Sequence, residues 1–242
     1  MRWGHLAAAA CAVVATGCAT VNHMALDKST KSIDTSSKSV VLLTLDIYRR
    51  DKSHFSLQPF VVQFEKPGAS SKADRQNFVL GKQDAVSSDD GHTLYLVRAA
   101  LAPGRYRLMG VVGRSMVFPI IGTFEVPLLL DFDLAPGTVS YRGRVTAMLR
   151  PREENEFRAG PMIPLIDQAA AGLSTGTWEV TVEDLSDQDL PRFTTLYPVL
   201  ASVTIAPAVL PPFDRQAAQR WWQGSSASEQ GSTPATTASA SK

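Results

Sequence analysis

Leu101-Ala102-Pro103-Gly104 recurs 33 positions later as Leu134-Ala135-Pro136-Gly137, and a tyrosine follows each copy, Tyr106 and Tyr141. Proline presets φ at the first corner of a tight turn, and glycine supplies the positive φ that the next corner needs. Apolar residues precede each turn, and an alternating pattern typical of a strand follows it. We therefore expect two strand–turn–strand units and not a repeat array, which would need three or more copies.

The sequence on either side of these turns predicts further strands. Residues 40–48 read V-V-L-L-T-L-D-I-Y and are dense in β-branched and aromatic side chains, as strands are. Other runs bounded by turn residues predict further strands, at 57–64, 78–80, 93–97, 138–149, 177–182 and 203–205. The pattern indicates one mainly β domain, an antiparallel β-sandwich of the immunoglobulin-like or transthyretin-like kind, with a partly closed barrel as the alternative.

An apolar stretch, 116–130, lies between the two turns and is broken by Pro119, Gly122 and Pro127. It is too short to cross a bilayer as a helix, and its prolines argue against any helix. One interpretation is a pair of short strands buried in the core, which we expect. The other is an exposed apolar hairpin that touches a partner or the membrane.

Two short helices complete the prediction. Residues 185–197 change to a helical period, with Ser186 and Asp189 spaced as in a capping box and Pro198 at the end. Asp214 can cap a second, amphipathic helix that continues to Trp222. Beyond it, 224–242 contains mainly serine, threonine, alanine and glycine, and this composition predicts a disordered tail.

The N-terminus has the layout of a secretory signal. Arg2 precedes an apolar run over 6–15, and the small residues that follow end in Ala15-Thr16-Gly17-Cys18. This order resembles the lipobox of bacterial lipoproteins. The resemblance implies cleavage before Cys18, acylation of its thiol and then of the new amine, and, with Ala19 in the next position, sorting to the outer membrane.

The resulting organisation has five parts. We expect a signal peptide at 1–17, the lipidated cysteine with a flexible polar tether at 18–38, the β domain at 39–213, the amphipathic helix at 214–223 and the tail at 224–242. An irregular arm packed on the domain is the alternative to the tether.

Net charge and cysteine content argue against several classes of function. Cleavage before Cys18 removes one of the 24 basic residues and leaves 23, against 23 acidic residues, so the mature chain is neutral. Neutrality argues against a nucleic-acid partner, and it makes membrane attachment depend on the acyl chains. Because Cys11 leaves with the signal and Cys18 would carry lipid, no thiol remains for a disulfide, a metal or catalysis.

The remaining residues give little sign of chemistry, so we expect no cofactor, no metal and no enzyme. His23, His54 and His92 have no second ligand at metal-binding spacing, and no G-x-S-x-G motif occurs. Asp131 and Asp133 share one face of a strand, where they could hold Ca²⁺ or act as an acid–base pair, but we expect a solvated sheet face.

Trp221 and Trp222 follow Arg220 and form an aromatic pair in the second helix. They could anchor the protein to a partner or to lipid headgroups, or they could pack on the domain and close its open end. Adjacent helical positions point about 100° apart, so one ring could pack while the other stays exposed. Both interpretations remain open.

A second resemblance covers about half of the chain. "L-x-P-G-x-Y" at 101–106, "P-G-x-x-x-Y-x-G" at 136–143 and "Y-P-x-L" at 197–200 resemble motifs of uncharacterised Gram-negative lipoproteins with transthyretin-like or immunoglobulin-like domains. That group has no assigned catalytic residues, so the resemblance implies only the sandwich and the anchor.

The function that we expect is therefore a lipid-anchored outer-membrane module, facing the periplasm or the cell surface, that binds an envelope protein or polymer or has a structural role. The alternative is a small periplasmic hydrolase or ligand-binding protein with its site in the 151–176 loop. An enzyme should bring His54 or His92 together with carboxylates and a hydroxyl.

Overall fold

The computed structural model describes residues 19–50, 56–88, 90–117, 120–157 and 176–230. Their strands are β1 (Thr20–Asn22), β2 (Ser39–Arg49), β3 (Ser56–Glu65), β4 (Arg75–Val79), β5 (Ala85–Ser87), β6 (Thr93–Leu101), β7 (Gly104–Val117), β8 (Ile120–Leu134), β9 (Val139–Pro151), β10 (Gly176–Glu183) and β11 (Ile205–Pro207). The helices are α1 (Ser186–Leu196) and α2 (Arg215–Gln230), and the 3-10 turns are η1 (Lys72–Asp74), η2 (Lys82–Asp84) and η3 (Pro198–Ser202). The expected mainly β fold with two helices is confirmed.

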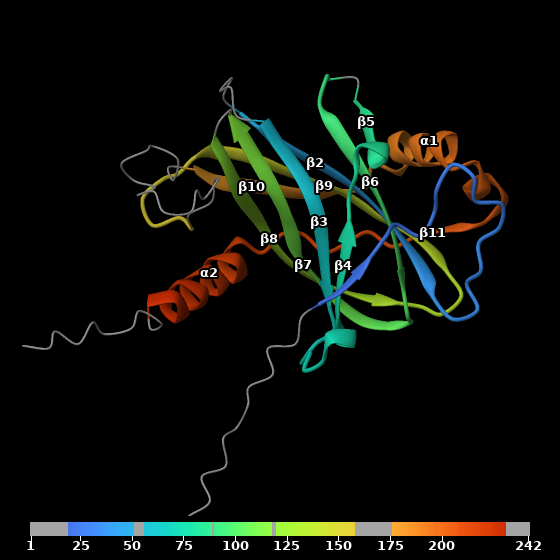
Figure 1. The fold of residues 1–242 in the computed structure, drawn as a ribbon, viewed down its shortest axis with the longest axis horizontal. Coiled ribbons are helices and arrows are strands. Elements are labelled where there is room, and N and C mark those ends of the chain that lie inside the picture. Colours follow the sequence, from blue (N-terminus) through green and yellow to red (C-terminus); the bar gives the residue numbers. More distant parts are fainter. Residues whose placement is uncertain (1–18, 51–55, 89, 118–119, 158–175, 231–242) are drawn as a thin grey trace, which may run out of the picture.

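The described strands form two mixed sheets (Figure 1). Sheet A has the order β1-β4-β3-β7-β8, and sheet B has the order β10-β9-β2-β6-β5, with β11 paired to β9 beside β10. Three pairs run parallel: β1 with β4, β2 with β9, and β11 with β9. The expectation of purely antiparallel sheets is therefore wrong. The physical reason lies in β2, whose side chains are buried without interruption from Ser39 to Ile47, as in strands that are covered on both faces.

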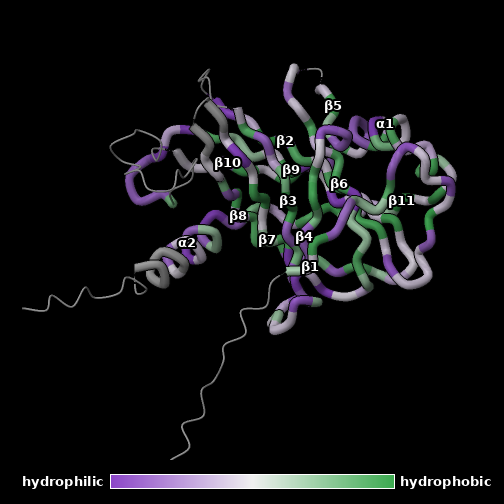
Figure 2. Tube along the Cα trace, in the orientation of Figure 1, coloured by the Kyte–Doolittle hydropathy of each residue, from purple (hydrophilic) through white to green (hydrophobic). Residues whose placement is uncertain are grey.

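One large hydrophobic cluster joins the inner faces of the two sheets. Alternate residues of β2, such as Leu43 and Leu45, meet Phe64 of β3 and Phe124 of β8 across it. Figure 2 shows hydrophobic residues concentrated along the strands in the middle of the molecule. Burial of this shared cluster holds the sheets together, since apolar area removed from water is the main stabilising term in folding.

A second cluster covers part of the outer face of sheet B. Leu42 of β2 and Tyr141 of β9 point to this side and meet Phe193 of α1 and Leu200 of η3. Leu26, which precedes β2, is buried in the same cluster. Thus α1 covers sheet B, whereas α2 lies on the opposite side of the molecule (Figure 1).

The two Leu-Ala-Pro-Gly turns carry the chain between the sheets. The first leads from β6 in sheet B to β7 in sheet A, and the second leads from β8 in sheet A back to β9 in sheet B. Gly104 and Gly137 have φ values of 140° and 68°, as the turn prediction requires. The strand–turn–strand units are confirmed, and the structure adds that each turn joins strands of different sheets.

The apolar stretch at 116–130 belongs to β7 and β8, apart from 118–119, which lie outside the described residues. Phe124, Val126, Leu128 and Leu130 are buried in the inner cluster, so the core interpretation is confirmed for this part. The strands are longer than expected. Pro127 pairs with Gly110, where the register of the β7–β8 pair shifts between Leu108 and Gly110.

Two terminal segments differ from expectation. The segment at 19–38 is a packed arm and not a free tether: β1 pairs with β4, and Ala25 donates a backbone hydrogen bond of 2.8 Å to Arg98 O. The physical reason is that Leu26 finds a buried place on sheet B. At the other end, α2 continues to Gln230, and residues 231–242 lie outside the described part of the chain.

Candidate functional site

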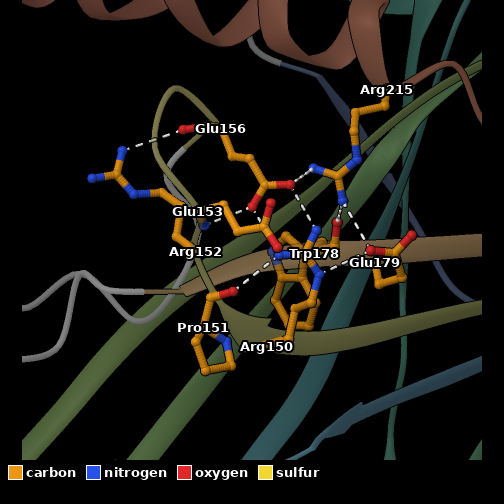
Figure 3. Close-up of polar contacts among 8 residues, drawn as sticks. All are labelled: Arg150, Pro151, Arg152, Glu153, Glu156, Trp178, Glu179 and Arg215. Carbon is orange, nitrogen blue, oxygen red and sulfur yellow. Dashed lines mark hydrogen bonds and ion pairs between the residues drawn. The ribbon is translucent and has the colours of Figure 1, made fainter.

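A network of ion pairs lies where β9, β10 and α2 meet (Figure 3). Arg150 at the end of β9 binds both carboxylate oxygens of Glu156, with its Nη2 at 2.6 Å from Oε1 and its Nη1 at 2.8 Å from Oε2. Its Nε donates to Glu179 Oε2 of β10 at 2.9 Å. Arg215, the first residue of α2, lies 3.1 Å from Glu156 and 3.3 Å from Glu179. The network therefore fixes the start of α2 to the edge of sheet B.

The network keeps Glu156 ionised. Its hydrogen bonds with Arg150 lower the pKa of Glu156 to about 2, and a backbone hydrogen bond from Glu153 acts in the same direction. Phe157, the next residue, is fully buried. The Arg215 guanidinium lies over its ring, with Cζ 5.4 Å from the ring centroid. Since Arg150 and Arg215 each contact both Glu156 and Glu179, the arrangement holds these elements together.

This network lies at the ends of the 151–176 loop, which the sequence analysis gives as the alternative site. Of that loop, 158–175 lie outside the described residues, whereas 151–157 and Gly176 are described. Pro151 pairs with Gly176, so the two ends of the loop meet at the edge of sheet B. Trp178, two residues further on, donates from Nε1 to Glu125 O of β8 at 2.9 Å and closes the gap between the sheets.

The aromatic pair of α2 lies beside the inner hydrophobic cluster. Trp222 packs against that cluster, and both Trp221 and Trp222 are half-buried. Arg220 is 66% exposed, and its Nη2 lies 3.9 Å from Asp214 Oδ2. Asp214 also accepts the Ala217 amide at 3.0 Å, as expected for a cap of this helix. Because Trp222 packs on the domain itself, a binding partner is not needed to explain this half of the Trp221–Trp222 pair.

A histidine–carboxylate pair lies on the outer face of sheet B. His92 Nδ1 is 3.2 Å from Asp46 Oδ2, and the Tyr48 ring lies 4.0 Å from the His92 ring. Asp46 is only 8% exposed, and its Oδ1 has no hydrogen-bond partner in the described part of the chain. Within the described residues the His92 ring makes no hydrogen bond to a hydroxyl. The other candidate, His54, lies outside them.

Asp189 of α1 is a buried carboxylate whose role differs from the helix cap that the sequence predicts. Asp189 does not close a capping box, because the N-cap of α1 is Leu185 and has no side-chain hydrogen bond. Instead Asp189 is fully buried, pairs with Arg144 and accepts from Tyr141 Oη at 2.7 Å. Burial and this hydrogen bond raise the pKa of Tyr141. Asp189 lies one helical turn before Phe193, the other buried residue of α1, and this spacing was the available signal for burial. Its partners lie 45 and 48 positions away, so no local pattern predicts them.

A second buried ion pair lies under η3. Arg98 of β6 pairs with Asp84 at 2.6 Å and donates from Nε to Leu26 O at 3.0 Å, and Arg98 and Asp84 are 3% and 1% exposed. Its guanidinium stacks on the Tyr197 ring at 4.0 Å. Burial raises the pKa of Tyr197 to about 12. Arg98 therefore contacts the N-terminal arm, η2 and Tyr197, the residue between α1 and η3, from one point of sheet B.

Asp131 and Asp133 of β8, half-buried and exposed, do not share a binding partner among the described residues. Arg107 donates from Nε to Asp131 Oδ1 at 2.6 Å and from Nη2 to Asp131 Oδ2 at 3.0 Å, and Arg105 Nη2 lies 3.6 Å from Oδ2. These contacts, with the Arg107 hydrogen bond foremost, lower the pKa of Asp131. In the described residues no group of three or more histidine, cysteine, aspartate or glutamate side chains is arranged to hold a metal ion.

An open hollow of about 410 Å³ lies between the arm and the start of β9. Its walls are Ile33 and Thr35 of the arm, residues 137–138 of the second turn, Val139 at the start of β9, and Val203, Thr204 and Ala206 before and within β11. The lining is apolar with threonine side chains, so it lacks the charged groups that fix an ionic ligand.

Cys18 lies outside the described residues, immediately before Ala19. No helix in the described part of the chain is long and apolar enough to cross a bilayer. Comparisons of the chain with protein-family models, with curated proteins and with solved structures give no match.

Proposed function

We propose that this chain is a lipid-anchored protein of the bacterial outer membrane, and that its β domain is a non-enzymatic binding or structural module of the cell envelope. The observation that carries the proposal is the sequence order from Arg2 to Cys18, which resembles a lipoprotein signal. Two or three acyl chains at Cys18 would give stable anchoring where one chain would not. The finer fold assignment, a transthyretin-like or immunoglobulin-like sandwich, belongs to the same proposal and is supported by the core that the two sheets share.

The charged clusters support a module whose polar groups hold its own elements together. The guanidinium groups of Arg98, Arg144 and Arg150 each face a carboxylate of another element, Asp84, Asp189 and Glu179. Trp221, Trp222 and Arg220 remain the surface that we propose for contact with a partner or with headgroups, because the helix that carries them lies at one side of the molecule (Figure 1).

The proposal is tested on the native protein and a Cys18→Ser variant by intact mass and membrane fractionation. We expect only the native protein to carry diacylglyceryl mass and to fractionate with the outer membrane. Release of an unmodified native protein would contradict the anchor, and Cys18 would then be a free thiol.

The His92–Asp46 pair favours a second candidate, a small hydrolase. A histidine whose Nδ1 faces a carboxylate is held in the orientation that suits a general base. Hydrolysis of simple esters by the purified protein, abolished in His92→Ala and retained in His23→Ala, would favour this candidate over the binding module.

A further inference from the structure

The fold begins almost at the cysteine that we propose to be acylated. Thr20, two positions after Cys18, is already paired with Gln76 of β4 in a parallel ladder. Two residues of extended chain span at most about 7 Å. Acyl chains on Cys18 would therefore hold the edge of sheet A directly at the membrane, because no spacer separates the two.

The segment beside this edge is the turn over residues 66–74, which ends in η1. Thr20 Oγ1 donates to Lys72 O at 3.0 Å, which joins β1 to η1. The turn is itself well held, since Lys66 N donates to Asp74 O at 2.9 Å and Ala69 N donates to Lys66 O at 3.1 Å. A fixed surface, and not a loose loop, therefore lies next to the anchor.

The exposed groups on this surface suit an interface with lipid headgroups. Lys72 is exposed, and Lys66 is half-buried, with its Nζ 6.0 Å from the Tyr106 ring centroid. Asp74 is the only carboxylate of the turn, and its Oδ2 accepts from Ser71 Oγ at 2.6 Å. Val21, the middle residue of β1, is 68% exposed. This surface thus carries two lysines and an apolar side chain, and the carboxylate of its turn, Asp74, is hydrogen-bonded to Ser71.

We propose that this end of sheet A, formed by Val21, Lys66 and Lys72, lies on the bilayer and that its lysines contact anionic phosphate headgroups. The inference rests on the proposed acylation of Cys18 and adds the orientation of the domain. A lysine gains from an anionic surface only within about 10 Å at ordinary ionic strength, and Lys72 is the residue that Thr20, two positions after Cys18, contacts. The ends of the strands on the η2 side then point away from the membrane.

The chain offers a matched pair of positions for the test. Lys72 and Lys82 are both exposed first residues of 3-10 turns, and they flank β4 at its two ends. In the acylated mature chain a cysteine at either position would be the only free thiol, because Cys11 is removed and the Cys18 sulfur is blocked. Full-length Lys72→Cys and Lys82→Cys proteins, each with a fluorescent label, are placed in vesicles of phosphatidylethanolamine and phosphatidylglycerol that contain a headgroup-quenching lipid.

We expect several-fold stronger quenching of the label at 72 than of the label at 82. Intact mass of the same samples reports whether Cys18 is acylated. If it is acylated and the two labels are quenched equally, the orientation is overturned and the anchor stands. If Cys18 is not acylated, the proposed anchor and the proposed orientation are both contradicted. Footprinting of the native lysines with an amine reagent checks the result without substitutions: Lys66 and Lys72 should react more slowly in vesicles than in detergent, and Lys82 should react equally in both.

Discussion

At the scale of single residues, the structure places its charges in pairs that the sequence shows only in part. Arg98 stands in the apolar run L-Y-L-V-R-A-A-L of β6 and is buried with Asp84 and the Tyr197 ring. A buried charge is stable only when it is paired, so an arginine within an apolar strand needs a partner elsewhere in the fold. The identity of that partner depends on how the strands pack, and no local pattern reveals it.

Glu156 gives a pH prediction at this scale. Its pKa of about 2 lies below the ordinary value of 4.5, so its contribution to the free energy of unfolding is present above pH 4.5 and is lost as pH falls towards 2. We expect urea unfolding of the native protein to lose on the order of 2 kcal/mol more between pH 6 and pH 2.5 than unfolding of Glu156→Gln. Glu154→Gln, at an exposed neighbour, is the control and should follow the native protein. Equal pH slopes for all three proteins would contradict the role of the network.

At the scale of elements, the sequence predicted most strands but not their partners. The Pro-Gly turns and the alternating runs are local signals, and the corresponding strands are present. The parallel pairing of β2 with β9 joins residues about 100 positions apart, from Val40 with Val139 to Arg49 with Leu149, which no local rule specifies. The unbroken burial of β2 was the available hint, since strands covered on both faces are often paired in parallel.

A substitution at Gly110 tests whether the register shift in the β7–β8 pair requires a residue without a side chain. A Cβ at this position would lie 2.3 Å from Val126 O, a backbone atom that cannot move without disturbing the strand. We expect Gly110→Ala to lower the free energy of unfolding by about 2 kcal/mol or more. Gly224 lies inside α2 with no atom within 4 Å of a Cβ, so Gly224→Ala should raise it by about 0.5–1 kcal/mol. Similar unfolding midpoints for the two variants would show that the close approach at Gly110 does not constrain the pair.

At the scale of the whole molecule, the pattern of strands and turns predicted one mainly β domain, and the described residues contain one inner core that both sheets share. The sequence failed at the arm because 19–38 contains few large apolar residues, and a polar composition normally predicts a free segment. One buried leucine, one short parallel strand and backbone contacts with Arg98 suffice to pack it. The candidate sites were harder to predict, because His92 meets Asp46 and Asp189 meets Arg144 only after the strands have aligned.

Leu26 decides between an arm and a tether. It is 4% exposed within the outer cluster of sheet B, whereas Val21 in β1 of the same arm is 68% exposed. Removal of a buried leucine side chain costs its transfer free energy and leaves a cavity, so Leu26→Ala should lower the free energy of unfolding by about 2–3 kcal/mol. Val21→Ala, the matched control, should change it by less than about 0.5 kcal/mol. Urea unfolding of both variants gives the measurement. A free tether would leave both variants as stable as the native protein, and the anchor would then no longer orient the domain on the membrane.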